Sequence, residues 1–294
     1  METYFKRLNN NNSLYQETKK YSHVGYQNHD LTLKFVFSGV QNYIMNKKEL
    51  MVHPDCFLMI NKGTDFESKI HSQDYVQSLS ISFDPKFIHD INRTLQNSTN
   101  YLLEHPVDDH TPDFHFPETL LPLKSNLLFN LHHIRRFVKN RVDDDHLLEE
   151  YLHHTYINYL EIFNHDVLLA EERLESLKQH TREEVIKRLN LAKDFIYCNY
   201  NQQIGLKEIA ENSFLSVNHL LRTFKQAFEE TPHQFLTKIR LKRANYLIKN
   251  TAFPINEIVP AVGFECASSF IRLYRSYFNC TPAKFRKANY YEKN

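Results

Sequence analysis

Four residues near the C-terminal end share one face of an expected helix. They follow the spacing 0, 3, 4 and 7 along the chain, and they are Asn218, Leu221, Arg222 and Lys225. Residues at this spacing are neighbours on a helix surface. An amide and a guanidinium on such a face can form hydrogen bonds with the edges of DNA bases, and the two cations can bind phosphates. The face therefore has the chemistry of a helix that enters a major groove.

The same face occurs a second time, 50 residues further along the chain. The matching residues are Ser268, Ile271, Arg272 and Arg275, and Thr281-Pro282 likewise repeats Thr231-Pro232. A repeat with this period indicates duplicated supersecondary units. One arginine on a helix is usually solvated surface. Two matching faces in one basic region instead favour a nucleic-acid partner.

Each outward face needs a buried side and a supporting helix behind it. Ser216 is a good N-cap for the first helix. The expected core sides are Leu220, Phe224 and Phe228 in the first copy and Phe270, Tyr274 and Phe278 in the second. The supporting helices have apolar sides at Leu206, Ile209 and Ala210 and at Ile258, Val259 and Val262. Residues 239–249 predict one long helix between the copies, which would hold the two faces about one DNA turn, ~34 Å, apart.

Charge is divided unevenly between the two parts of the chain. Residues 1–179 hold 18 Lys and Arg against 25 Asp and Glu, whereas residues 180–294 hold 18 against 10. The net charge is thus −7 in the first part and +8 in the second, although the whole chain carries only +1. This asymmetry predicts that the C-terminal part meets a polyanion.

The C-terminal motifs resemble a known family. They read RLKRANYLIK from Arg240, IVPAVGF from Ile258, SFIRLYR from Ser269 and TPAKFR from Thr281. This region, roughly residues 181–286, is similar to the AraC/XylS family of transcriptional regulators. The resemblance implies a bacterial DNA-binding domain of two helix-turn-helix units joined by a long helix. In that family the domain is commonly fused to an N-terminal sensing and dimerisation domain.

The resemblance also implies which side chains contact DNA. By position, base-reading roles fall on Asn218, Leu221 and Arg222 in the first unit and on Ser268, Ser269 and Arg272 in the second. Lys225 and Arg275 are the predicted phosphate contacts. The implied partner is double-stranded DNA. A homodimer, a small-molecule effector and RNA polymerase are the further partners that such a regulator would have.

Four positions depart from the family pattern. Pro260 stands inside a supporting helix, where a proline costs ~3 kcal/mol unless it falls near an end or a kink. Glu229 replaces the usual glycine after the first recognition helix, and Phe214 occupies the turn of the first unit. Cys266 replaces a capping serine in the second unit. The two units are therefore expected to contribute unequally to base reading.

The N-terminal half has a different pattern. Residues 1–25 are polar and rich in asparagine, and we expect a loosely held arm there. Short β-rich segments bounded by turn signals follow over residues 31–83. In the last of them, Leu79, Ile81 and Phe83 alternate with polar residues and form the predicted buried side. Strands at this spacing predict a small antiparallel β-barrel, which is similar to the cupin-like sensor of many AraC-type proteins.

The expected fold class is α+β. Helical patterns follow Pro85, with two longer helices at about 118–139 and 143–164. The charged piece at residues 170–181 contains nothing that must be buried, and we interpret 171–181 as a linker. The predicted organisation is an arm at 1–25, a cupin-like sensing and dimerisation domain with flanking helices at 26–170, the linker, and an all-α domain of two helix-turn-helix units at 182–290.

Metal and catalytic chemistry have little support in the sequence. The pairs Glu149 with His153 and Glu150 with His154 have helical i, i+4 spacing, but no third ligand is placed near them. The four cysteines lie far apart, without a zinc or disulfide pattern. No P-loop, dinucleotide-binding glycine motif or nucleophile elbow occurs. We therefore predict no catalytic residue, no cofactor and no metal.

Two alternatives to a regulator remain open. One is an enzyme whose barrel performs chemistry while the helical part tethers it to DNA. The other is a protein-interaction module with a vestigial DNA-binding domain, a hypothesis that draws on Pro260 and Glu229. The polar N-terminus and the lack of an apolar run of ~18 residues predict a cytoplasmic protein without membrane contact.

Overall fold

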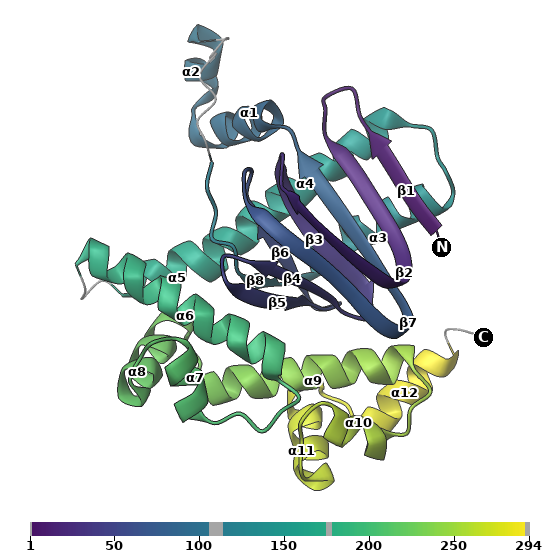
Figure 1. Cartoon of the computed structure of the whole chain (residues 1–294), viewed down its shortest axis with the longest axis vertical. Coiled ribbons are helices and arrows are strands. Elements are labelled where there is room, and N and C mark those ends of the chain that lie inside the picture. The colour runs from purple at the N-terminus through teal and green to yellow at the C-terminus, as the bar shows by residue number, and fades with distance from the viewer. Residues whose placement is uncertain (1, 106–113, 175–177, 292–294) are drawn as a thin grey trace. The chain divides into compact units, whose positions relative to one another are not determined.

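The chain contains both helices and a sheet (Figure 1). It divides into two compact units. This computed structural model describes residues 2–105, 114–174 and 178–291. The first unit is Met1–Ile162 and the second is Phe163–Asn294. The sheet lies in the first unit, and the second unit is built from helices.

The first unit is organised around one antiparallel sheet. Within the described residues, its eight strands are β1 (Glu2–Arg7), β2 (Ser13–Gln27), β3 (Leu31–Ser38), β4 (Gln41–Met45), β5 (Lys48–Val52), β6 (Cys56–Ile60), β7 (Asp65–Phe83) and β8 (Leu120–Pro122). The hydrogen-bonded order is β1-β2-β7-β3-β6-β8, while β4 pairs with both β7 and β5. The predicted short strands over 31–83 are thus confirmed, with β7 longer than expected.

The sheet is open, which corrects the predicted β-barrel. A barrel requires its two outermost strands to pair with each other. Here β1 and β8 lie at opposite ends of the hydrogen-bonded order, and β8 is only three residues long. Alternation along a strand indicates which side is buried, but it does not specify which strands are neighbours. Closure therefore could not be derived from the pattern.

The first residues form strands, so the predicted loose arm at 1–25 is wrong. β1 pairs with β2, and β2 pairs along β7. The asparagine-rich run makes the turn of this hairpin: Asn11 has a φ of 63°, and the buried Asn12 accepts a hydrogen bond of 2.8 Å from the backbone N–H of Asp84. Polar side chains suit the turn itself because they pair with backbone groups there, while Leu8 and Leu14 on either side of the turn are buried.

One face of the sheet packs against a helix. The helices of this unit are α1 (Pro85–Gln96), α2 (Thr99–Glu104), α3 (Ser125–Lys139) and α4 (Asp145–Phe163). The rings of Phe83 and Tyr156 lie 5.4 Å apart between centroids, and those of Phe57 and Tyr159 lie 6.2 Å apart. The predicted buried side of β7 is confirmed by this packing. The expected helix at 118–139 begins only at Ser125, because β8 occupies the residues before it.

The second unit follows the predicted order of helices. These are the π-helix η1 (Asn164–Leu168), α5 (Leu169–Glu172), α6 (Gln179–Asn199), α7 (Leu206–Asn212), α8 (Val217–Phe228), α9 (Pro232–Asn250), α10 (Ile255–Ala261), α11 (Ala267–Phe278) and α12 (Pro282–Tyr291). α7 and α10 are the expected supporting helices, α8 and α11 are the expected outward helices, and α9 is the long helix between them. α9 is longer at both ends than the predicted 239–249.

The predicted linker at 171–181 is displaced. Residues 175–177 of it lie outside the described part of the chain. The division between the units falls at residues 162 and 163 instead, and Ala170 and Leu174 are buried, contrary to the expectation that nothing there needs burial. Ala170 and Leu174 form a narrow apolar side of this segment, and the charged residues around them in the sequence mask the pattern. The segment that follows Ile162 therefore belongs to the helical unit.

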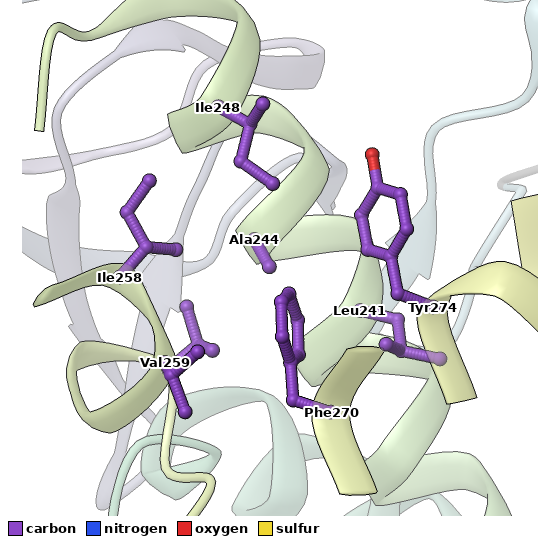
Figure 2. Packing of buried hydrophobic residues seen from close by; sticks show 8 residues of the cluster. Leu241, Ala244, Ile248, Ile258, Val259, Phe270 and Tyr274 are labelled. Atoms are coloured by element: carbon purple, nitrogen blue, oxygen red, sulfur yellow. The ribbon is translucent and has the colours of Figure 1, made fainter. Parts of the chain in front are cut away.

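A hydrophobic cluster joins the second outward helix to α9 (Figure 2). Its fully or almost fully buried members are Leu241, Ala244, Ile248, Ile258, Val259, Val262, Phe270 and Tyr274. The Tyr274 hydroxyl donates a 2.6 Å hydrogen bond to Asn245 Oδ1 on α9. The predicted core sides of α10 and α11 are confirmed by this packing. α11 is thus fixed on one side, and its opposite side is free for other contacts.

Gly263 makes the turn between α10 and α11. Its φ of +87° is a conformation that side-chain-bearing residues rarely adopt. A Cβ at this position would lie 2.7 Å from Tyr200 O and 2.9 Å from Arg240 Nε. The turn therefore requires glycine for its backbone conformation and for the close approach of α9.

Gly263→Ala should lower the free energy of unfolding by about 1 to 3 kcal/mol, because positive-φ strain adds to the clash with Tyr200 and Arg240. Gly63→Ala is the matched control, since Gly63 has a φ of +83° but no atom within 4 Å of an added Cβ. Its loss should be smaller. Urea denaturation of both variants measures the difference. Equal losses would show that the close approach at Gly263 is unimportant.

Candidate nucleic-acid interface

The first outward helix, α8, presents most of its predicted contact face to solvent. Ser216 caps the helix by accepting a 3.3 Å hydrogen bond from the backbone N–H of His219, as predicted. Asn218, Arg222 and Lys225 are exposed, whereas Leu221 is half-buried. On the other side, Leu220 and Phe224 are fully buried. The structure therefore brings the amide and the two cations onto one accessible face.

The second outward helix, α11, presents an open hollow of about 590 Å³. Ser268, Ile271, Arg272, Arg275, Ser276 and Thr281 line it. Three of these, Ser268, Arg272 and Arg275, were predicted as contact residues, and all three are exposed. Ser269 is half-buried and is not part of the lining. Ser276 and Thr281 were missed, although Thr281 carried a signal as half of the repeated Thr-Pro pair.

The turns of the two units differ in length and conformation. In the first unit the turn covers residues 213–216, and Phe214 has a φ of 55° with 73% of its surface exposed. In the second unit the turn covers residues 262–266 and contains Gly263. The second turn is one residue longer. Positions 50 residues apart therefore correspond in the structure only from the N-cap of each outward helix onward, that is, from Ser216 and Cys266.

Glu229 ends α8 in the left-handed conformation that usually selects glycine. Its φ is 60°, and its backbone N–H donates a 2.9 Å hydrogen bond to Lys225 O. Asn279 ends α11 in the same way with a φ of 56°. The Glu229 carboxylate forms a 2.9 Å ion pair with Arg173, whose guanidinium also donates to Ala227 O at 3.0 Å. Arg173 therefore clamps the C-terminal end of α8 from the segment before α6.

Pro260 lies one residue before the end of α10. A proline there removes one helical hydrogen bond but leaves the rest of this short helix unaffected. The backbone closes the helix after it, because Gly263 N–H donates to Pro260 O at 2.9 Å and Phe264 N–H donates to Val259 O at 3.0 Å. The helix-turn-helix geometry is therefore compatible with this departure from the family pattern.

Two arginines of α9 serve the scaffold rather than the exposed faces. Arg240 is 9% exposed, and it donates 2.7 Å hydrogen bonds to Tyr200 O and Gln202 O in the loop before α7. Arg243 is 4% exposed, and its guanidinium lies 5.0 Å from the ring centre of Tyr200. Both cations fasten α9 to α6 and the loop that follows it. The net charge of the C-terminal part therefore includes two buried arginines that a polyanion could not reach.

Cys266 stands at the N-cap of α11. Its Sγ lies 3.1 Å from the Ser268 hydroxyl. Hydrogen bonds from Ser268 and then from Ser269 lower the pKa of the fully exposed thiol to about 7. A thiolate is stabilised by donors at a helix N-terminus. The start of the second outward helix therefore carries a partly ionised sulfur near neutral pH.

Neither a metal-binding cluster nor a membrane-spanning helix occurs in the described residues. Over residues 2–105, 114–174 and 178–291, no group of three or more His, Cys, Asp and Glu side chains is arranged to hold a metal ion. In the same described ranges, no helix has the length and apolar character needed to cross a bilayer.

Paired helices define the class of the second unit. In each pair a short supporting helix, a turn and a longer helix with an exposed cationic face follow one another, which is the arrangement of a helix-turn-helix domain. Residues 209–288 match the family model described as a helix-turn-helix domain. This C-terminal part of the chain is a helix-turn-helix domain of the AraC type.

Curated relatives share this region. The chain is 30% identical over 99 residues to the Msm operon regulatory protein of Streptococcus mutans, covering 34% of this chain and 36% of that protein. It is 29% identical over 120 residues to the transcriptional activator RhaS of Escherichia coli, covering 41% of this chain and 43% of RhaS. The chain thus spans less than half the length of these relatives. Their names describe regulators of transcription rather than enzymes.

A solved structure also resembles this region. It is a transcriptional regulator of the AraC-type DNA-binding class from Chromobacterium violaceum, with 30% sequence identity and a TM-score of 0.34. The match covers 35% of this chain and 91% of that one.

The alkylation rate of Cys266 should rise with a midpoint near pH 7, because only the thiolate reacts with iodoacetamide and its pKa is lowered to about 7. Peptide mass spectrometry after timed labelling follows Cys266 separately from the other cysteines. Ser268→Ala removes the main hydrogen bond and should move the midpoint upward. An unchanged midpoint in that variant would contradict the assigned cause.

Proposed function

We propose that this chain is a sequence-specific DNA-binding regulator of transcription that inserts α8 and α11 into successive major grooves. The observation that carries the proposal is the repeated face: each helix has a buried aromatic side and an exposed side with two cations. A helix that only packs within a protein core has no use for an exposed cationic face. Here the same face occurs on two helices. The names of the relatives support the same function.

The long helix supports a shared binding geometry. α9 has 19 residues and is about 28 Å long at 1.5 Å per residue. Successive major grooves on one side of B-DNA recur at ~34 Å. A helix of this length, with its arginines fastened to neighbouring loops, is suited to hold two recognition helices at nearly that spacing.

The roles of individual side chains follow from position and exposure. We assign base contacts to Asn218, Leu221 and Arg222 on α8 and to Ser268, Ser269 and Arg272 on α11, and phosphate contacts to Lys225 and Arg275. Exposure supports the arginines most directly, since a guanidinium can bind guanine in a bidentate manner. Leu221 and Ser269 have the weakest support, because both are half-buried.

The first unit is proposed to sense an effector and to form a homodimer. An effector would act by binding one DNA-competent arrangement more tightly than another. RNA polymerase is the proposed further partner at the promoter, and the cytoplasm of a bacterium is the proposed location.

Arg222→Ala and Arg272→Ala should each weaken binding to specific DNA by about 1 to 3 kcal/mol, because each removes a guanidinium proposed to contact a base. DNA selected from a randomised duplex pool with the unmodified chain provides the ligand, and fluorescence polarisation measures its affinity. Arg222→Lys should keep affinity for random DNA and lose discrimination, since lysine cannot reproduce the bidentate contact.

Lys187→Ala is the control for these variants, because Lys187 is an exposed cation on α6 outside the proposed faces. It should bind the selected DNA as the unmodified chain does. If Arg222→Ala and Arg272→Ala also bind it without loss, the assigned faces are wrong.

Lys225→Ala and Arg275→Ala should weaken binding similarly for all sequences. Each loses one phosphate contact, so the slope of log affinity against log salt should become shallower by ~1. Titrations at four or more salt concentrations measure the slope. Unchanged slopes would refute the phosphate assignment while leaving the base contacts standing.

A further inference from the structure

The first unit contains a polar cavity within its sheet. It has a volume of about 200 Å³. Its lining includes the polar residues Glu17, Lys19, Lys34, Gln41, Ser68 and Ser80. They come from β2, β3, β4 and β7. Successive residues of a strand point to opposite faces of the sheet. Lys34 and Ser80 therefore point away from the face where Phe35 and Leu79 are buried.

Lys34 is the most unusual group in this cavity. Only 4% of it is exposed, and its Nζ donates a 3.1 Å hydrogen bond to Ser80 Oγ. The ring centre of Phe66 lies 5.1 Å from the same atom, and that of Tyr43 lies 6.0 Å away. Burial lowers the pKa of Lys34 to about 8, and the nearby Glu17 carboxylate opposes this effect. The cavity thus contains an ammonium group that is still mostly protonated at neutral pH.

The lining is more basic than acidic. Glu17 forms a 2.7 Å ion pair with Lys19, which raises the pKa of Lys19. The lining therefore contains two ammonium groups and one carboxylate. An anionic group entering this space would gain more attraction than repulsion.

Gln41 places a hydrogen-bond acceptor in the cavity that is unpaired within the described residues, and a ligand would have to satisfy it. Its Nε2 donates to Ser68 Oγ at 2.7 Å and to Glu17 Oε1 at 3.4 Å. These contacts orient the amide, and its buried Oε1 has no hydrogen-bond partner among the described residues. A buried acceptor without a donor costs free energy. A hydroxyl group in the cavity would satisfy it.

From these groups we infer that the cavity binds a small hydroxylated anion, with its acidic group at Lys34 and a hydroxyl group at Gln41. The volume equals that of roughly seven water molecules at ~30 Å³ each, which suits a molecule the size of a sugar acid or a sugar phosphate. This inference rests on the proposed function, because it specifies the class of effector that the first unit would sense.

Matched sugars test the inference on the full-length chain. Glucuronate, glucose 6-phosphate, glucose and glucosamine share one ring and differ in charge, and isothermal titration calorimetry without DNA measures their affinities. The two anions should bind at least about tenfold more tightly than glucose, because only they form an ion pair with Lys34, in which both hydrogen-bonding groups are charged. Glucosamine should bind most weakly. A preference for glucuronate over glucose 6-phosphate, or the reverse, identifies the acidic group.

Two substitutions connect binding to the named atoms. Lys34→Met keeps the length of the side chain beside Phe66 and Tyr43 but removes the charge, and it should weaken anion binding about tenfold or more. The variant no longer buries an ammonium group, and its melting temperature checks that it remains folded. Gln41→Met should weaken binding of anions and of glucose alike. Lys62→Met, at an exposed lysine between β6 and β7, is the control and should change nothing.

The pH dependence gives an independent readout. Anion binding requires protonated Lys34, so the affinity should fall about tenfold between pH 7 and pH 9 as the pH passes the Lys34 pKa of about 8. Tyr15, Glu17 and Lys19 on β2 and Tyr43 on β4 also face the cavity. The raised pKa values of Lys19 and Tyr15 keep both in one protonation state over this range.

Three results would overturn the inference. The first is that no anion binds more tightly than glucose, whether all four sugars bind equally or none binds. The second is an unchanged affinity in Lys34→Met, and the third is an affinity that does not depend on pH between 7 and 9. Normal binding of selected DNA in the same preparations would then show that only the ligand class is wrong. Loss of DNA binding by the unmodified chain would instead refute the proposed function.

Discussion

Burial of aromatic side chains on one side of α8 and α11, the proposed recognition helices, is the constraint on which the helical unit depends. Phe270 and Tyr274 are fully buried against α9, and Tyr274 is also fixed by its hydrogen bond to Asn245. A helix anchored in this way cannot rotate without opening its core. The residues on the opposite side are therefore held in one orientation, which a rigid reader of DNA requires. The exposed cations contribute chemistry, whereas the buried rings determine where that chemistry points.

Most of the helical unit could be predicted from the sequence because its signals are local. Ser216 acts as an N-cap at the predicted position, and the apolar spacing of α8 and α11 gave the correct buried sides. Sheet closure was wrong because strand pairing joins residues far apart in the chain. The buried Ala170 and Leu174 were missed because charged neighbours hide a two-residue apolar side. The contact roles on DNA stay predictions, since they depend on a partner that the fold alone does not specify.

The serines of β7 illustrate how a pattern can be read correctly on one face and overlooked on the other. Leu79, Ile81 and Phe83 are buried as predicted, but Ser78 is buried too, and Ser80 lines the polar cavity. Alternation with small polar residues is typical of a strand whose second face meets water. Here the second face meets Lys34 and Glu17 instead. The signal was Lys34 between the apolar residues Leu33 and Phe35 of β3, because a strand facing only a hydrophobic core would not contain a lysine there.

The contacts of Arg173 make α8 and α11 differ in how they are attached to the rest of the helical unit. Arg173 joins the segment before α6 to the last turn of α8 through Glu229 and Ala227, whereas α11 is secured by the hydrophobic cluster on α9. In the proposed function, α8 is thus the DNA-contacting helix whose C-terminal end depends on an ion pair that salt weakens, while α11 is held by apolar packing that salt leaves intact.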